Sequence, residues 1–207
     1  MVEMMDVKPV ILTGKHVRLE PLSENHVAGL SAIGLDDDIW RYMPYGPIRR
    51  EEDIRRWVNG LLELEAQRTD LPFAVIDLSS GRVAGATRYI EIRPEHRGLE
   101  IGGTWYGSEF RRTHVNTECK YLLLKHAFET LGAIRVQLKT DSRNERSQRA
   151  IGRLGAVKEG ILRNHLILPD GYIRHSVYYS ILDSEWPRVK DRLEQMLSKK
   201  FSSRLTR

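Results

Sequence analysis

The chain has 207 residues and is 41% hydrophobic, which is enough to bury a substantial core in one domain. A single cysteine, Cys119, excludes an intramolecular disulfide, and no stretch reaches the roughly 18 apolar residues of a membrane span. The net charge of +5 and the pI of about 9.4 favour anionic partners, including phosphorylated cofactors.

The two ends of the chain bear on its location and partners. Residues Met1–Leu12 lack the apolar core of a signal peptide, so we expect a cytoplasmic protein with no membrane partner. Acidic residues are interspersed with basic ones except in the tail Lys199–Arg207, which we expect to be a solvated end and not a nucleic-acid arm. We therefore expect no direct nucleic-acid partner.

In the first half of the chain, the sequence predicts one strand, two helices and then three more strands. His16–Glu20 alternates like a strand, Ser23 caps a helix to about Leu35, and Arg49–Arg68 has the apolar stripe of an amphipathic helix. Strands are then predicted at Phe73–Asp77, Arg82–Ile92 and Leu99–Tyr106; the turn Ser79–Gly81 joins the first two.

The second half alternates helices with strands. Helices are predicted at Thr117–Leu131, at Ser142–Leu154 with a capping box from Ser142 to Glu145, and at Trp186–Leu197. Strands are predicted at Arg135–Thr140, Lys158–Leu168 and Tyr172–Leu182. This order predicts an α/β (α+β) domain with a mixed sheet and helices on its faces.

Three local features could carry chemistry. The unit Leu99–Leu131 is a strand, a polar turn with Arg111 and Arg112, and a helix, and a helix N-terminus can hold a pyrophosphate. Gly102–Gly103 inside a strand indicates a bulge or the close approach of a ligand. Asn144 and Ser147 share a helical face with Ile151, so they point toward the sheet. Each feature also has a purely structural interpretation: a solvated loop, a kink or a helix cap.

Together these features resemble the GNAT N-acyltransferase superfamily, and most closely its RimJ/RimL-like branch. The resemblance extends from about Leu12 to Leu182. It is carried in chain order by Leu12–Leu22, Leu99–Tyr106, Arg111–Glu118, Asn144–Ser147 with Leu154–Ala156, Gly160–Arg163 and Asp170–Arg174. The resemblance implies one domain over residues 1–207 with its core at about 12–182. It also implies a mostly antiparallel, twisted sheet of about seven strands, with a V-shaped opening between strands four and five, which are Leu99–Tyr106 and Arg135–Thr140.

The resemblance also implies an acyl-CoA co-substrate, most simply acetyl-CoA, and no metal. The residues that it implies for binding the co-substrate are Gly103, Thr104, Trp105, Tyr106, Arg111, Arg112, Thr113, His114, Val115, Asn116, Thr117, Asn144 and Arg149. His114 and Asn116 replace small residues of the family's phosphate loop. Histidine is among the residues enriched at positive φ, so the loop would keep its shape. The His114 ring would then face solvent, contact the phosphates of the co-substrate or block their binding.

Catalysis by direct attack of an amine needs an unprotonated amine and a proton donor for the departing thiolate. We assign Glu100 as the candidate base, through water, with Glu91 and His96 in reserve, and Ser147 as the candidate acid. Glu100 could instead be a salt-bridged carboxylate. Backbone N–H groups near Gly103 would stabilise the oxyanion.

The sequence specifies the acceptor substrate less closely than the co-substrate. The resemblance implies a primary amine, either a protein N-terminus or a small molecule, and an acetyl or a succinyl donor. Trp40, Tyr42 and Tyr45 could line the acceptor site or simply pack. We expect a monomer or homodimer. The alternative from another class is a non-catalytic CoA-binding or regulatory protein whose site has degraded around His114.

Overall fold

The computed structural model describes residues 4–198, and the basic tail lies outside them. One eight-stranded sheet forms its centre, with strand order β1-β2-β3-β4-β5-β6-β8-β7. The strands are β1 (Leu12–Thr13), β2 (Val17–Pro21), β3 (Leu71–Asp77), β4 (Val83–Arg93), β5 (Gly98–Tyr106), β6 (Arg135–Asp141), β7 (Val157–Ile167) and β8 (Ile173–Leu182). Within residues 4–198, β5 and β6 form the sole parallel pair. The predicted mixed, mostly antiparallel sheet is confirmed, with the two-residue β1 added.

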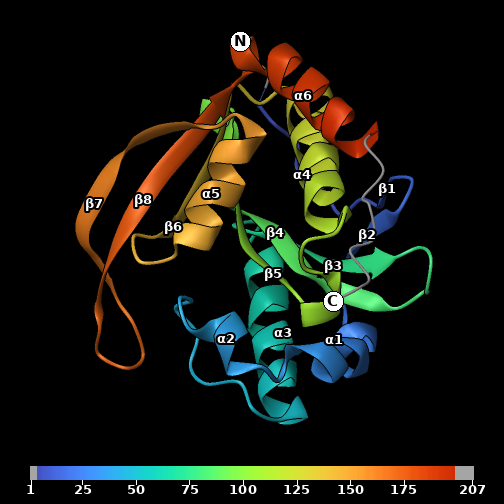
Figure 1. Ribbon diagram of the computed structural model, residues 1–207, viewed down its shortest axis with the longest axis vertical. Helices are drawn as coiled ribbons and strands as arrows, with labels where there is room; N and C mark the ends of the chain where they lie inside the picture. Colours follow the sequence, from blue (N-terminus) through green and yellow to red (C-terminus); the bar gives the residue numbers. More distant parts are fainter. Residues whose placement is uncertain (1–3, 199–207) are drawn as a thin grey trace, which may run out of the picture.

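Helices cover both faces of the sheet, as Figure 1 shows. The helices α1 (Val27–Gly34), α2 (Asp37–Trp40) and α3 (Glu51–Ala66) lie on one face. The helices α4 (Val115–Lys125), α5 (Glu145–Leu154) and α6 (Trp186–Ser198) lie on the other. Two separate hydrophobic clusters result, one under each set of helices. No helix within residues 4–198 is long and apolar enough to cross a membrane.

The starts of α4 and α5 differ from the sequence prediction. The helix α4 begins at Val115, two residues early, and continues as a π-helix over His126–Thr130. The helix α5 begins at Glu145, where Asn144 and not Ser142 is the N-cap: its side chain accepts the Ser147 N–H at 3.0 Å. Asparagine caps as well as serine does, and spacing alone does not choose between them.

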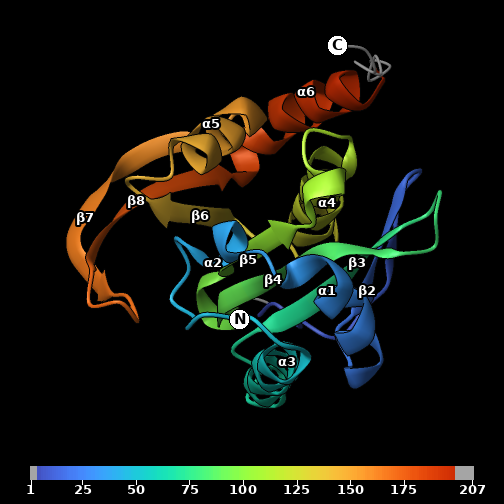
Figure 2. The same cartoon turned by 60° about the horizontal axis from the view of Figure 1, so that its bottom comes forward.

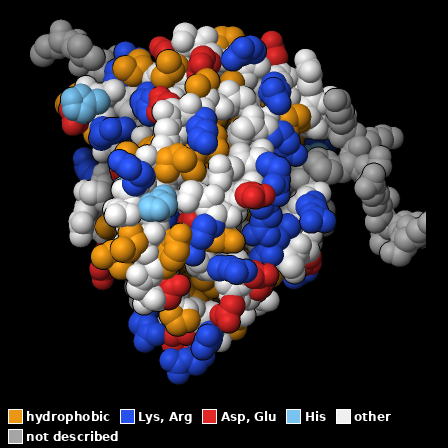
Figure 3. Space-filling view, turned by 60° about the vertical axis from the view of Figure 1, so that its left-hand side comes forward, with side chains coloured by type: hydrophobic (Ala, Val, Ile, Leu, Met, Phe, Trp, Pro, Cys, Tyr) orange, Lys and Arg blue, Asp and Glu red, His pale blue; other side chains and the backbone are white. Residues whose placement is uncertain are grey.

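The hairpin β7–β8 extends away from the helices and curves at one side of the molecule (Figures 1 and 2). Strand β8 pairs with β6 along the whole length of β6, from Arg135 opposite Leu182 to Asp141 opposite Ser176. The hairpin therefore lies beside β6, on the side of β6 that faces away from β5. The face shown in Figure 3 carries a band of Lys and Arg side chains with scattered acidic groups among them.

Candidate active site

A bulge in β5 marks the centre of the site. Opposite β4, the register jumps from Trp105 paired with Ala86 to Gly102 paired with Arg88, so β5 holds one extra residue there. Gly103 has a φ of +57°, and a Cβ at this position would lie 2.9 Å from Arg88 Nε. A side chain would be strained by both the dihedral angle and the contact. The paired glycines therefore form the predicted bulge.

The opening lies beside this bulge. The parallel pairing of β5 with β6 runs through only three residue pairs and ends at Glu100 opposite Gln137. Strand β5 continues to Tyr106 and β6 to Asp141 without further pairing between them. The two strands thus diverge, as the predicted V-shaped opening requires. One edge of the stretch Gly103–Tyr106 faces that opening, where backbone groups can bind an extended ligand.

Glu100 lies at the apex where the two strands part. Its side chain is 1% exposed, accepts a hydrogen bond from Gln137 Nε2 at 2.8 Å, and lies 3.1 Å from Lys139 Nζ. Burial raises the pKa of Glu100, while the Lys139 ammonium opposes that rise. Lys139 also pairs with Glu91 at 2.6 Å. A buried carboxylate with a raised pKa at a cleft is a frequent site for a general base.

The loop before α4 has a different geometry from the one expected at His114. His114 has φ −67° and ψ −20°, within the helical region, and the left-handed residue is Arg112 with φ +62°. The loop therefore accommodates histidine without the strain expected of a positive φ. The His114 ring lies against that of His16, with centroids 4.1 Å apart. Burial, and then the neighbouring His16, lower the pKa of His114.

Other groups of this loop hold it in shape. Arg111 Nε donates to the Tyr106 carbonyl at 3.0 Å and its guanidinium reaches Asp36, so Arg111 ties the end of β5 to α2. Thr113 Oγ1 accepts the Val115 N–H at 3.2 Å and donates to the Phe110 carbonyl at 2.7 Å. The first-turn N–H groups of α4, at Asn116 and Thr117, have no acceptor within the helix and are suited to an anion.

The start of α5 brings Asn144 and Ser147 together. The Asn144 side chain is occupied by its capping bond to the Ser147 N–H, and Ser147 itself is half-buried. Arg149, by contrast, is exposed and pairs with Glu145 one turn earlier at 3.1 Å. A bound co-substrate would have to draw Arg149 away from this pair.

The three aromatic residues considered for the acceptor site separate into two groups. Trp40 is a core residue: it is 4% exposed, packs against Trp57 and Trp105, and donates to the Gly34 carbonyl at 2.7 Å. The Tyr45 hydroxyl accepts from Arg88, the residue that covers the bulge. Tyr42 lies at the surface. Its ring faces Arg143, and both residues line a pocket of about 320 Å³ at the start of α5.

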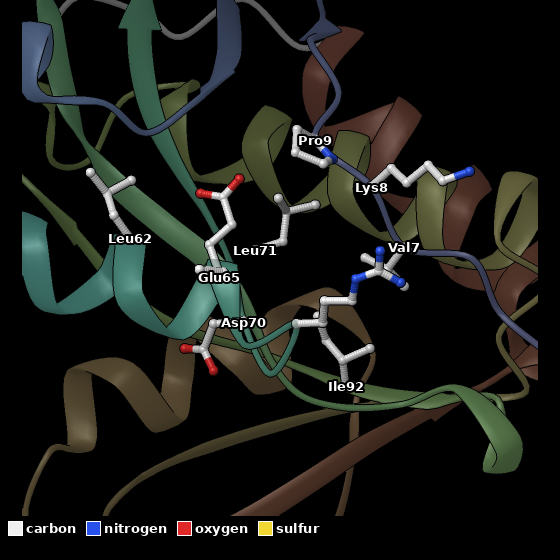
Figure 4. Close-up of a pocket in the computed structure, with 10 residues that line it drawn as sticks. Val7, Lys8, Pro9, Leu62, Glu65, Asp70, Leu71 and Ile92 are labelled. Carbon is white, nitrogen blue, oxygen red and sulfur yellow. The ribbon is translucent and has the colours of Figure 1, made fainter.

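A second cavity, of about 410 Å³, lies away from this opening, between the N-terminal segment, the end of α3, and strands β3 and β4. In Figure 4 the carboxylates of Glu65 and Asp70 lie on one side of it and Lys8 lies on the other. Asp70 pairs with Arg88, which connects this cavity to the bulge. None of the residues expected to bind the co-substrate line it.

Sequence reasoning missed three polar residues of the site. Gln137 and Lys139 meet Glu100 only through the register of β6. Lys120 is buried in α4, where its Nζ donates to Thr104 Oγ1 at 2.6 Å. Lys120 did carry a detectable signal, because it shares a helical face with the apolar Leu124 and Ala127. Within residues 4–198, no cluster of three His, Cys, Asp or Glu could hold a metal ion.

Comparison with known proteins agrees with this geometry. The chain is 24% identical over 178 residues to the ribosomal-protein-serine acetyltransferase of Escherichia coli K12, covering 84% of this chain and 98% of that protein. It is 32% identical over 113 residues to Bacillus subtilis YdaF, a candidate ribosomal N-acetyltransferase by name; that match covers 55% of this chain and 61%, less than two thirds, of that protein.

Solved structures share the fold. A GCN5-related N-acetyltransferase from Brucella melitensis superposes with a TM-score of 0.88 at 30% identity, covering 95% of this chain and 89% of that one. The model of the acetyltransferase (GNAT) domain matches residues 16–157, more than half of the chain. The resemblance drawn from the sequence is thus confirmed, and the chain belongs to the GNAT acetyltransferase family.

Proposed function

We propose that this protein transfers an acetyl group from acetyl-CoA to a primary amine by direct attack within a ternary complex, and that the amine is a protein N-terminus. The observation that carries the proposal is the position of Glu100. It is a buried carboxylate with a raised pKa at the apex of the opening between β5 and β6. The names of the relatives, a ribosomal-protein-serine acetyltransferase and a candidate ribosomal N-acetyltransferase, support a protein acceptor.

The residues present fit a CoA ester. The first-turn N–H groups of α4 and the loop Arg111–Thr117 would hold the pyrophosphate, with Arg111 acting through the loop that it braces. The open edge of Gly103–Tyr106 would pair with the pantetheine amides. Asn144 would act by fixing the start of α5 and Arg149 by turning from Glu145 toward a phosphate.

In the reaction, Glu100 would take the amine proton through water, and Ser147 would donate a proton to the departing thiolate. An N-terminal α-amine has a pKa of about 7.7–8.0, so it needs little help to lose its proton near neutral pH. A lysine amine, with a pKa of about 10.4, needs far more. Because the site offers one carboxylate as a base, this difference in pKa favours an α-amine over a lysine amine as the acceptor.

The acceptor would approach from the face of Tyr42 and Tyr45, where Arg174 of β8 donates a hydrogen bond to the Tyr42 carbonyl at 3.0 Å. We propose the whole chain as one catalytic domain acting in the cytoplasm. The non-catalytic alternative depended on damage at His114, and the helical dihedrals of His114 argue against backbone strain as a source of such damage.

Two measurements test the proposal. Acetyl-CoA should stabilise the protein against heat more than NAD or ATP does, by roughly 2.7 kcal/mol at 100 times its Kd. Thiol release from acetyl-CoA should then depend on an added amine, and a peptide with a free N-terminus should outperform small amines. CoA binding without thiol release for any amine would restore the non-catalytic alternative. Release with succinyl-CoA but not with acetyl-CoA would contradict the donor.

A further inference from the structure

A buried lysine without an acidic partner lies beneath the bulge of β5. Lys120, in the second turn of α4, is 6% exposed, and its Nζ donates to Thr104 Oγ1 at 2.6 Å. Thr104 Oγ1 is 2.8 Å from Thr87 Oγ1 on β4. Among residues 4–198, the charged or titratable groups that act on Lys120 are Glu100 on β5 and the neighbouring Cys119, and neither forms an ion pair with it.

This arrangement is unfavourable for folding alone. Removing an ammonium from water without a counter-ion is costly, and an apolar residue of similar volume would fill the position at less cost. Burial lowers the pKa of Lys120 to about 8. Near neutral pH the ammonium still predominates, so α4 holds an uncompensated positive charge against the sheet. Such a positive charge is suited to stabilising the negative charge of a ligand that binds and leaves again.

The bulge fixes where this charge lies relative to the opening. Before the bulge, Glu100 points toward Gln137 and Lys139 on one face of the sheet. After it, Thr104 points to the other face, toward α4 and Lys120. The extra residue at Gly103 thus places a carboxylate and an ammonium on opposite faces of the same short stretch of β5. That stretch is the one whose edge faces the opening.

We propose that Lys120 is the charge-stabilising residue of the acyl-transfer site: its ammonium, held by Thr104, stabilises the negative charge that develops on the thioester oxygen and then on the CoA sulfur. This inference rests on the proposed function. The amine nitrogen forms a bond to the carbonyl carbon, and the carbonyl π pair moves to oxygen. When that pair returns, the C–S bond breaks and its electrons leave on sulfur. The amine proton goes to Glu100 through water, the departing CoA thiolate takes a proton from Ser147, and Lys120 keeps its own proton throughout.

The test uses CoA alone, without an amine. A nearby ammonium lowers the pKa of a thiol, so the thiol of bound CoA should titrate lower in the wild type than in Lys120→Met, by at least about one pH unit. Thiolate absorbance, as a difference from the ligand-free protein, measures this pKa. Burial raises the pKa of Cys119 to about 12, which keeps the protein's own thiol out of the titration near neutral pH.

Matched variants isolate the charge. Lys120→Gln keeps a donor for Thr104 but carries no charge, so it should behave as Lys120→Met does. Lys125→Met removes an exposed lysine of the same helix and should leave the wild-type value. Both Lys120 variants should melt at or above the wild-type temperature, because Thr87 and Thr104 can satisfy each other. Their turnover should fall roughly 10- to 100-fold.

Three results would overturn the inference. The first is an equal thiol pKa in the wild type and both Lys120 variants, with CoA bound in all three. The second is a lower melting temperature in both Lys120 variants, which would make Lys120 a residue of the fold. The third is an unchanged thiol pKa together with lost discrimination between succinyl-CoA and acetyl-CoA, which would place the charge at the acyl end. Failure of the wild type to bind CoA would instead overturn the proposed function.

Discussion

Lys139 Nζ lies 3.1 Å from a carboxylate oxygen of Glu100, on the neighbouring strand at the apex of the opening. This contact opposes the effect of burial on Glu100, so it keeps the candidate base ionised over a wider range of pH. The same ammonium pairs with the half-exposed Glu91. The charge state of Glu100 is therefore set by a residue outside the family motifs.

Replacing Lys139 should shift the pH profile of the enzyme. In Lys139→Met, burial and the like charge of Glu91 are opposed by the Gln137 hydrogen bond alone, so the pKa of Glu100 should rise further. The acid limb of kcat/KM should move to higher pH by about one unit or more. Lys158→Met, on the exposed surface of β7, is the matched control. An unmoved acid limb with lower activity at every pH would show that Lys139 serves another purpose.

Glu100→Gln tests the base directly. The amide keeps an acceptor for Gln137 and Lys139 but takes no proton, so kcat/KM should fall roughly 100-fold or more near neutral pH. The deficit should shrink toward about pH 9, where an α-amine is already unprotonated. The profile of kcat/KM is compared with that of Glu95→Gln, an exposed carboxylate. A deficit that stays constant up to about pH 9 would argue against the role of base.

Ser147→Ala tests the proton donor. The backbone N–H of residue 147 would still bond Asn144, so the cap of α5 and the melting temperature should be retained. Turnover should fall roughly 100-fold with little change in acetyl-CoA affinity. Ser142→Ala, in the turn between β6 and α5, is the control. Unchanged turnover, when chemistry limits the rate, would leave Ser147 a structural residue.

His114→Gly tests the loop. Because burial and the ring of His16 lower its pKa, His114 is neutral near pH 7. Acetyl-CoA affinity should then stay flat between about pH 7 and 8 in both proteins, and the variant should melt lower because it loses the ring contact. Calorimetric titration measures both affinities. Tighter binding by His114→Gly at every pH would mean that the ring obstructs the phosphates, and an affinity that weakens with pH only in the wild type would mean that the ring binds them.

Local sequence patterns were sufficient for much of the fold. Apolar periodicity predicted Arg49–Arg68 as a helix, observed at Glu51–Ala66, because one apolar stripe suffices to specify a surface helix. Gly102–Gly103 predicted the bulge because the backbone there needs a positive φ. Both features depend on residues close together in the sequence.

Features that depend on tertiary contacts were not predictable in the same way. Lys139 meets Glu100 only through the parallel register that sets Glu100 opposite Gln137. The aromatic residues around Trp40 are equally compatible, in the sequence, with the lining of a pocket and with a hydrophobic core. In the structure Trp40 packs against Trp105 on β5, so it is a core residue. The roles of Glu100 and Ser147 stay predictions.

Acetylation of a peptide pair tests whether the protein transfers acetyl groups to a protein N-terminus. One peptide carries a free N-terminal serine and an internal lysine, and the other is identical except that its N-terminus is blocked. After incubation with acetyl-CoA and the protein, mass spectrometry locates the added acetyl group. We expect acetylation of the free α-amine, at a rate that Glu100→Gln lowers, and no modification of the blocked peptide. Acetylation of the lysine in both peptides, or of neither peptide while acetyl-CoA binds, would contradict it.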